Sequence, residues 1–169
     1  MDKKSVDSNY AWVNSPLGWI SVTANDDVIT SVIFHDNIEL TPVTPEKIFP
    51  LQHQCIQQLQ EYFNGQRRQF DLPLGQPGTS FQAGVWQLLT EIPFGKTISY
   101  LQLALQTGDA NATRAVANAN GRNNIAIIVP CHRVIGSNGE LTGYAGGLWR
   151  KKWLLEHEQK LAHGLQTLF

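Results

Sequence analysis

The chain has 169 residues, of which 42% are hydrophobic and 16% are charged, a composition typical of a folded globular protein with one large domain or two small ones. No apolar run reaches the ~18 residues of a membrane-spanning helix. Residues 1–5 contain neither an apolar core nor a cleavage site, so we expect no signal peptide and a cytoplasmic location. The composition therefore disfavours secreted and membrane-embedded functions.

The net charge of −1 conceals an uneven distribution along the chain. Residues 1–78 hold five Lys/Arg and nine Asp/Glu, whereas residues 79–169 hold eight Lys/Arg and five Asp/Glu. The second half is therefore mildly basic, which predicts a weak, salt-sensitive and largely sequence-independent attraction to nucleic acid.

The two cysteines, Cys55 and Cys131, are 76 positions apart, and no Cys-x-x-Cys pair is present. A zinc site needs three or four ligands, usually in closely spaced pairs, so we expect no metal. A reducing compartment also disfavours a disulfide between them.

The first half has the pattern of a small sheet-and-helix unit. Residues 10–13, 19–23 and 28–34 are β-prone runs separated by turn-forming residues, which predicts three strands. Apolar residues then recur at intervals of three and four, which predicts a helix over residues 45–63 that ends at Gly65. Cys55 lies on the apolar stripe of this helix, so we assign it to the core.

A Pro/Gly-rich stretch at residues 72–78 indicates a domain boundary. We therefore expect an α+β fold with a small N-terminal sheet-plus-helix domain at residues 1–78 and a mostly helical domain at residues 79–169.

In the second half, Thr79 or Ser80 is expected to cap a helix. Its predicted apolar face consists of Phe81, Val85, Leu88, Leu89 and Ile92. Residues 99–107 and 112–120 then flank a short turn that contains Gly108, which is the outline of a helix-turn-helix. Many helix pairs share this outline and bind nothing. A short strand is expected to lead to Cys131.

The run Ile-Val-Pro-Cys-His-Arg-Val-Ile-Gly at residues 128–136 is the most informative part of the chain. The thiolate is the reactive form of cysteine, and a free thiol has a pKa of ~8.5. The imidazole of His132 can remove the proton from Cys131, directly or through a water. The alternative is a buried structural cysteine beside an incidental histidine.

Around this run the sequence resembles the O6-alkylguanine-DNA alkyltransferases, a family of DNA-repair proteins. Their Pro-Cys-His-Arg-Val signature is complete at residues 130–134. Further matches follow in register: Ile-Ser-Tyr at 98–100, Thr-Arg-Ala-Val at 113–116, Asn123, Gly-Tyr-Ala-Gly-Gly at 143–147 and Trp-Leu-Leu-Glu-His-Glu at 153–158. The resemblance is close over residues 79–163 and loose over the first 78.

The resemblance implies a suicidal alkyl transfer, with residues 79–169 as the DNA-binding and alkyl-transfer domain and residues 1–78 as the scaffold. Cys131 would take the alkyl group from guanine O6 as a thioether, which offers water no activated carbonyl, so the protein would be spent after one turnover. His132 would act as the base through an ordered water, and Glu158 would orient His132 by accepting its other N–H. Asn123 would brace the reactive segment, and Arg133 is interpreted as structural.

The resemblance also implies how the protein handles duplex DNA. Tyr100 would protonate the departing guanine at N3, and Arg114 would fill the space left by the flipped base. The helix that carries Arg114, Thr113 and Ala115 would enter the minor groove. Residues of the expected base pocket are Val134, Tyr144, Ala145 and Gly146. The expected substrates are O6-alkylguanine and O4-alkylthymine in double-stranded DNA, with a monomeric protein and no cofactor.

Two other functions remain open from the sequence. The alkyltransferase-like proteins bind damaged DNA without reacting, but they commonly have tryptophan where this chain has Cys131. A cysteine hydrolase would need an oxyanion hole, and it would leave Arg114 and the helix pair without a purpose.

Overall fold

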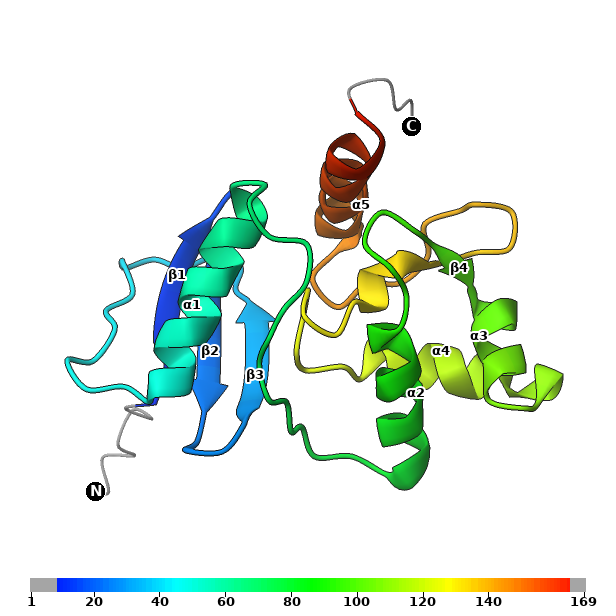
Figure 1. Cartoon of the computed structure of the whole chain (residues 1–169), viewed down its shortest axis with the longest axis horizontal. Coiled ribbons are helices and arrows are strands. Elements are labelled where there is room, and N and C mark those ends of the chain that lie inside the picture. Colours follow the sequence, from blue (N-terminus) through cyan, green and yellow to red (C-terminus); the bar gives the residue numbers. More distant parts are fainter. Residues whose placement is uncertain (1–8, 165–169) are drawn as a thin grey trace. The chain divides into compact units, whose positions relative to one another are not determined.

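The computed structural model describes residues 9–164, so the residues 1–5 that bear on a signal peptide lie outside the described part. The chain divides into two compact units, Met1–Pro77 and Gly78–Phe169 (Figure 1). The boundary expected from the sequence falls between residues 78 and 79. None of the helices within residues 9–164 is long and apolar enough to cross a membrane.

The first unit contains a three-stranded antiparallel sheet in the order β1-β2-β3. The strands are β1 (Ala11–Ser15), β2 (Gly18–Ala24) and β3 (Ile29–Phe34). Ser15 pairs with Gly18 across a tight turn, and Gly18 has a φ of 95°, a conformation that favours glycine. Helix α1 (Pro50–Phe63) packs against β1 and β2, which encloses the core of this unit (Figure 1).

Helix α1 begins five residues later than the sequence pattern predicts, so the predicted start at residue 45 is wrong. Pro50 occupies the first helical turn, and the steric demand of its ring holds Phe49 in an extended conformation with a ψ of 144°. The side chain of Gln52 then accepts a hydrogen bond from Phe49 N at 2.9 Å, which closes the helix start. The assignment of Cys55 to the core is confirmed, since it is fully buried.

The second unit is mostly helical. It contains α2 (Ser80–Thr90), α3 (Tyr100–Gln106), α4 (Thr113–Gly121) and α5 (Leu148–His163), with two short strands, β4 (Ile98–Ser99) and β5 (Val134–Ile135), that pair in parallel. Helix α4 packs against both α2 and α3. The α+β fold predicted from the sequence is confirmed.

Helix α2 starts where the sequence predicts, because Thr79 Oγ1 accepts a hydrogen bond from Gln82 N at 3.1 Å. Its apolar face is partly different from the predicted one. Phe81 is 43% exposed, whereas Trp86 is buried and donates its indole N–H to Ala119 O at 2.9 Å. The indole partner on α4 favours burial of Trp86, because a buried N–H needs an acceptor.

Helices α3 and α4 form the predicted helix-turn-helix. Gly108, with a φ of 94°, ends the first helix, and Asp109 Oδ1 accepts from Asn111 N at 2.8 Å in the 3₁₀ turn that follows. Thr113, Arg114 and Ala115 therefore lie on the first turn of α4.

The short strand expected to lead to Cys131 is wrong, since β5 follows this residue instead of preceding it. Residues 131–133 form a 3₁₀ turn. Pro130 has no N–H for a strand ladder, and Ile127 has a φ of 70°, which no strand tolerates. The approach to Cys131 is therefore irregular despite its β-prone residues.

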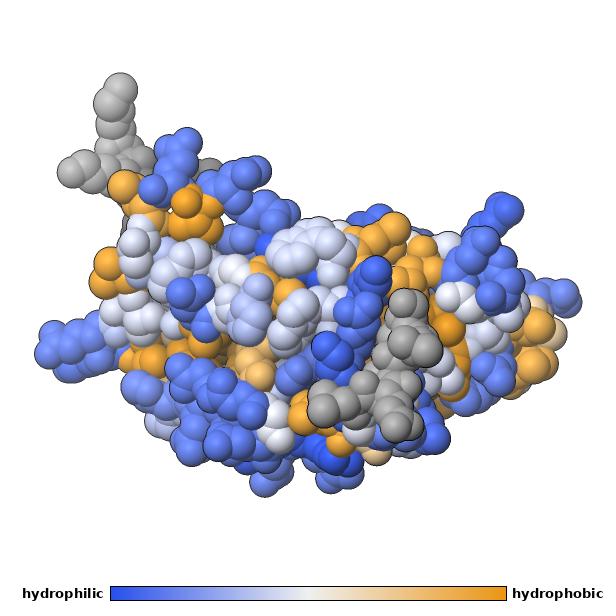
Figure 2. Space-filling model, turned by 90° about the horizontal axis from the view of Figure 1, so that it is seen from above, coloured by the Kyte–Doolittle hydropathy of each residue, from blue (hydrophilic) through white to orange (hydrophobic). Residues whose placement is uncertain are grey.

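The surface of the molecule is mixed in character. On the face shown in Figure 2, hydrophilic residues predominate and apolar residues lie between them. Large apolar side chains that are about half exposed include Leu105 and Trp149.

Candidate active site

Cys131 opens the 3₁₀ turn of the second unit and is buried, with 7% of its surface exposed. Its backbone N donates to Val129 O at 2.8 Å. Its carbonyl oxygen accepts from Asn120 Nδ2 of α4 at 3.4 Å. The nucleophile predicted from the sequence is therefore held by backbone bonds at the end of a tight, irregular segment.

Asn123 braces the segment that precedes Cys131. Its Nδ2 donates to Val129 O at 2.9 Å and to Ile125 O at 3.2 Å, and its Oδ1 accepts from Ile125 N at 3.0 Å. A single side chain thus replaces the strand pairing that these backbone groups would otherwise need. The Asn123 side chain also acts on the Cys131 thiol and lowers its pKa.

His132, Arg133 and Glu158 form a buried network. His132 Nε2 lies 2.7 Å from Glu158 Oε1, while Arg133 donates from Nε to Oε2 and from Nη2 to Oε1, both at 2.9 Å. Arg133 Nη1 also donates to Ile92 O at 2.7 Å. Glu158 lies within α5 and is fully buried, so it is not a solvated carboxylate at a helix end.

The network fixes the charge of Glu158. Burial alone would raise its pKa, but His132, Arg133 and their hydrogen bonds hold the pKa well below the usual range of a carboxyl group. Burial lowers the pKa of His132, and the opposing effect of Glu158 does not restore it. The pair therefore consists of an ionised Glu158 and a neutral His132 at neutral pH.

A neutral His132 that donates from Nε2 carries its lone pair on Nδ1. This Nδ1 atom is buried and makes no hydrogen bond to any group within residues 9–164. It is therefore the ring nitrogen with free capacity to accept a proton.

Burial raises the pKa of the Cys131 thiol, while the hydrogen bond from Asn123 and the charge of Lys151 lower it. Burial raises the pKa of Cys55 to about 12. The pKa of Cys131 remains raised, but Asn123 and Lys151 offset part of the burial effect.

The second unit contains a groove of about 600 Å³. It is lined by Tyr100, Thr113, Arg114, Ala117, Asn120, Gly121, Thr142, Gly143 and Tyr144. Asn120 connects the groove to Cys131, because it lines the groove and its Nδ2 also donates to the Cys131 carbonyl. Tyr100 donates its hydroxyl to Thr142 O at 3.0 Å.

The groove brings together four of the predicted DNA and base contacts, namely Tyr100, Thr113, Arg114 and Tyr144. The other predicted residues, Ala115, Val134, Ala145 and Gly146, are not among its lining. Val134 is fully buried in β5, while Ala145 is exposed and Gly146 O accepts from Arg150 Nη1 at 2.9 Å.

Sequence reasoning missed two polar residues of the site, Asn120 and Lys151. Lys151 is fully buried, and Nζ donates to Thr142 O at 3.0 Å and to Gly143 O at 3.3 Å. A signal for Lys151 was present, since Lys151, Leu154, Leu155 and Glu158 follow the spacing of one helix face. A lysine and a glutamate on the apolar face of a helix indicate charged side chains that are buried in the protein.

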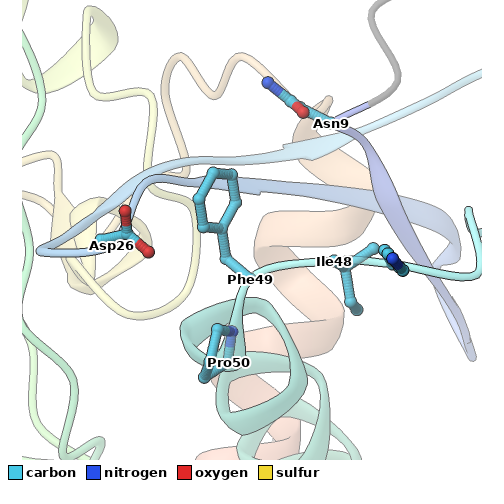
Figure 3. Close-up of a pocket in the computed structure, with 6 residues that line it drawn as sticks. Asn9, Asp26, Ile48, Phe49 and Pro50 are labelled. Carbon is cyan, nitrogen blue, oxygen red and sulfur yellow. The ribbon is translucent and has the colours of Figure 1, made fainter.

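A second hollow, of about 360 Å³, lies in the first unit and is lined by Asn9, Asp26, Lys47, Ile48, Phe49 and Pro50 (Figure 3). Its lining contains no cysteine or histidine, so it offers no nucleophile–base pair. Within residues 9–164, no three His, Cys, Asp or Glu side chains come together in a way that could hold a metal ion.

The chain matches known proteins over nearly its whole length. The model of the 6-O-methylguanine DNA methyltransferase ribonuclease-like domain matches residues 9–76, and that of the 6-O-methylguanine DNA methyltransferase DNA-binding domain matches residues 80–160. The methylated-DNA–protein-cysteine methyltransferase of Mycolicibacterium paratuberculosis is 43% identical over 161 residues, or 95% of this chain and 98% of that protein.

A second relative and a solved structure agree with these matches. The constitutive methylated-DNA–protein-cysteine methyltransferase of Bacillus subtilis is 42% identical over 91% of this chain and 96% of its own length. The crystal structure of Mycobacterium tuberculosis OGT in complex with DNA is similar with a TM-score of 0.81 and 44% identity, covering 90% of this chain and 94% of that one.

The chain is thus a two-unit α+β protein whose second unit contains a helix-turn-helix and a buried segment with Cys131 and the His132–Glu158 pair. The chain belongs to the 6-O-methylguanine DNA methyltransferase family.

Proposed function

We propose that this protein repairs duplex DNA by moving an alkyl group from guanine O6 onto the sulfur of its own Cys131. Its family makes it a methylated-DNA–protein-cysteine methyltransferase. The observation that carries the proposal is the buried chain of contacts that joins Glu158 to a neutral His132, next to Cys131 and a groove that opens onto α4.

The transfer begins with proton removal. The Nδ1 atom of His132 takes the Cys131 proton through a bridging water, and the ionised Glu158 stabilises the imidazolium that forms. The thiolate then attacks the alkyl carbon in line with the bond to O6. A carbon–sulfur bond forms, the carbon–oxygen bond breaks, and its electron pair stays with the guanine.

Tyr100 completes the proton balance at the base. Its hydroxyl passes a proton to guanine N3 as the negative charge develops, and the tyrosinate recovers a proton from solvent afterwards. In the structure this hydroxyl bonds Thr142 O at 3.0 Å, so it must exchange that acceptor for the base. The product is S-alkyl Cys131, a thioether that water does not hydrolyse, so each molecule reacts once.

DNA handling is assigned to α4 and the groove. Extrusion of a base costs a few kcal/mol, and the exposed Arg114 is positioned on the first turn of α4 to fill the vacated stack. Thr113 and Ala115, on the same turn, face the DNA backbone in this proposal. The extruded base would be enclosed by Tyr144, Ala145 and Gly146 and would bond the backbone of Cys131 and Val134.

Several finer features belong to the same proposal. Residues 79–169 would bind DNA and transfer the alkyl group, while residues 1–78 would act as the scaffold. The protein would work as a monomer inside the cell, without a cofactor, and would accept O4-alkylthymine as a second substrate.

Intact-mass measurement after incubation with an excess of an O6-methylguanine oligonucleotide tests the proposal. We expect one methyl mass per chain, located on Cys131 by peptide mapping, with Cys55 unmodified and no transfer to a Cys131→Ser protein. Product formation beyond one equivalent would instead indicate a hydrolase. Tight binding without transfer would indicate a damage-binding module.

A further inference from the structure

Lys151 is a charged residue of the second unit that is fully buried. It lies on α5, and a fully buried lysine is rare in proteins unless it is paired with an opposite charge. No carboxylate within residues 9–164 lies at ion-pair distance from its Nζ. Its hydrogen bonds go to two carbonyl oxygens, those of Thr142 and Gly143. The ammonium is therefore solvated by dipoles but not neutralised.

The groups around Lys151 belong to the proposed reaction. Its Nζ lies 5.8 Å from the centre of the Tyr100 ring, on α3. Cys131 and His132 lie on the 3₁₀ turn at residues 131–133. The positive charge of Lys151 acts to lower the pKa of both side chains. Glu158, on the same helix, is already bonded to His132 and Arg133. The thiolate of Cys131 is thus the anion that remains for Lys151 to face.

We propose that the Lys151 ammonium is the counter-ion of the Cys131 thiolate and so acts as a positioning residue for alkyl transfer. The inference deepens the proposed function and rests on it. A thiolate in a buried site is costly unless a positive charge compensates it. Since His132 becomes cationic only after it takes the proton, Lys151 supplies a positive charge that is present before the reaction begins.

The neighbouring lysine provides a matched control. Lys152 is one residue further along α5, its side chain is 60% exposed, and its Nζ lies 3.9 Å from Glu156 at the surface. Lys151→Met removes the buried charge and keeps the length of the side chain, while Lys152→Met removes the same charge from the surface. Both variants change the net charge of the protein equally.

The first measurement is the pKa of the Cys131 thiol, from the pH dependence of thiolate absorbance with Cys131→Ser as the blank. We expect Lys151→Met to raise this pKa by about one unit, which is about a tenfold loss of thiolate at neutral pH. Lys152→Met should leave it unchanged. An equal thiol pKa in the folded Lys151→Met protein and the wild type would overturn the proposal.

The second measurement separates charge from packing. Burial lowers the pKa of Lys151 to about 8, so the wild type itself loses this charge in alkaline solution. The single-turnover rate of Lys151→Met on methylated DNA should therefore be about tenfold low at neutral pH and approach the wild-type rate well above pH 8. A deficit that persists across the pH range would mean that Lys151 only supports the loop at Thr142 and Gly143.

A third measurement uses the wild-type chain and needs no variant to fold. The pKa of Lys151 can be followed by NMR of its labelled Cε in the reactive protein and in the S-methylated protein. Because coupling between two sites is reciprocal, loss of the thiolate should lower the Lys151 pKa. An unchanged value would refute the counter-ion role. Failure of the wild type to accept a methyl group would refute the proposed function, whereas the thiol titration would still test Lys151.

Discussion

The Nε2 atom of His132 lies 2.7 Å from Oε1 of Glu158, and both side chains are fully buried. This contact joins two segments 26 residues apart in the sequence and sets both the tautomer and the orientation of the imidazole. It leaves Nδ1 as the only ring position that can accept a proton. The reactivity of Cys131 should therefore depend on the Glu158 carboxylate, which contacts His132.

Substitution of that carboxylate tests this dependence. Glu158→Gln keeps an oxygen that can accept from His132 but removes the charge that stabilises the imidazolium. We expect the single-turnover rate of methyl transfer to fall about ten- to hundredfold, within the range of general-base effects, and the thiol pKa of Cys131 to rise. An unchanged rate together with an unchanged thiol pKa would show that the carboxylate is structural only.

Stability should also depend on Glu158. Removal of its charge leaves the buried Arg133 without its ionic partner, and breaking a buried pair in this way costs about 3–5 kcal/mol. Urea unfolding at neutral pH measures the loss. Glu156→Gln is the control, because Glu156 only meets the surface Lys152 at 3.9 Å, and it should change stability by less than about 1 kcal/mol.

The same network predicts how stability changes with pH. The pKa of Glu158 is held below the ~4.3 of an unfolded chain, so its charge stabilises the fold above that value and this contribution is lost as the pH falls toward the folded-state pKa. The pKa of His132 is lowered by burial below ~6.5, so acid again favours the unfolded chain. Wild-type stability should fall on acidification more steeply than that of Glu158→Gln. Parallel curves would contradict the network.

The parts of the fold that local patterns control were predictable. The spacing of Val85 and Leu89 predicted the buried face of α2, and Thr79 predicted its cap. The pattern failed for Phe81 and Trp86, because both are apolar and the choice depends on the Ala119 carbonyl of another helix. Local propensity cannot report such a partner.

The site shows a similar division between local pattern and tertiary contact. The β-prone residues before Cys131 do not form a strand, because the Asn123 side chain bonds their backbone and Pro130 donates nothing. Only the family resemblance assigned Glu158 as the partner of His132. The structure places Glu158 Oε1 2.7 Å from His132 Nε2, while the adjacent His157 stacks on Trp153 at 4.7 Å between ring centres.

Asn120 offers a further prediction that sequence reasoning did not make. Its Nδ2 bonds the Cys131 carbonyl at 3.4 Å, but its buried Oδ1 has no partner within residues 9–164. Asn120→Leu should therefore change stability by less than about 1 kcal/mol, since one long hydrogen bond and one unsatisfied oxygen are lost together. The rate of methyl transfer should fall about fivefold as the nucleophile segment loosens, with DNA affinity unchanged.

The exposed Asn118 on α4 is the control for this substitution. Asn118→Leu should leave the rate of methyl transfer at the wild-type value. If Asn120→Leu also reacts at the wild-type rate, the contact between α4 and Cys131 has no part in the reaction.

The last prediction separates DNA handling from chemistry through Arg114. Extrusion of a base costs a few kcal/mol, which the exposed Arg114 is proposed to offset by filling the stack. The free base O6-benzylguanine needs no extrusion, provided that the site admits it. Arg114→Ala should therefore slow repair of duplex DNA by about a hundredfold, equivalent to about 2.7 kcal/mol, and change the reaction with the free base little.

Arg122, which is exposed at the other end of α4 and does not line the groove, is the matched control for charge. Arg122→Ala removes the same charge and should slow duplex repair only by the loss of one phosphate contact. Because phosphate contacts depend on salt, all proteins must be compared at one salt concentration. Cys131→Ala should abolish both reactions. A residue that only fills the space of a flipped base has no role when no base is flipped. If Arg114→Ala slows repair of duplex DNA and reaction with the free base equally, Arg114 therefore supports the groove and does not stabilise the extruded base.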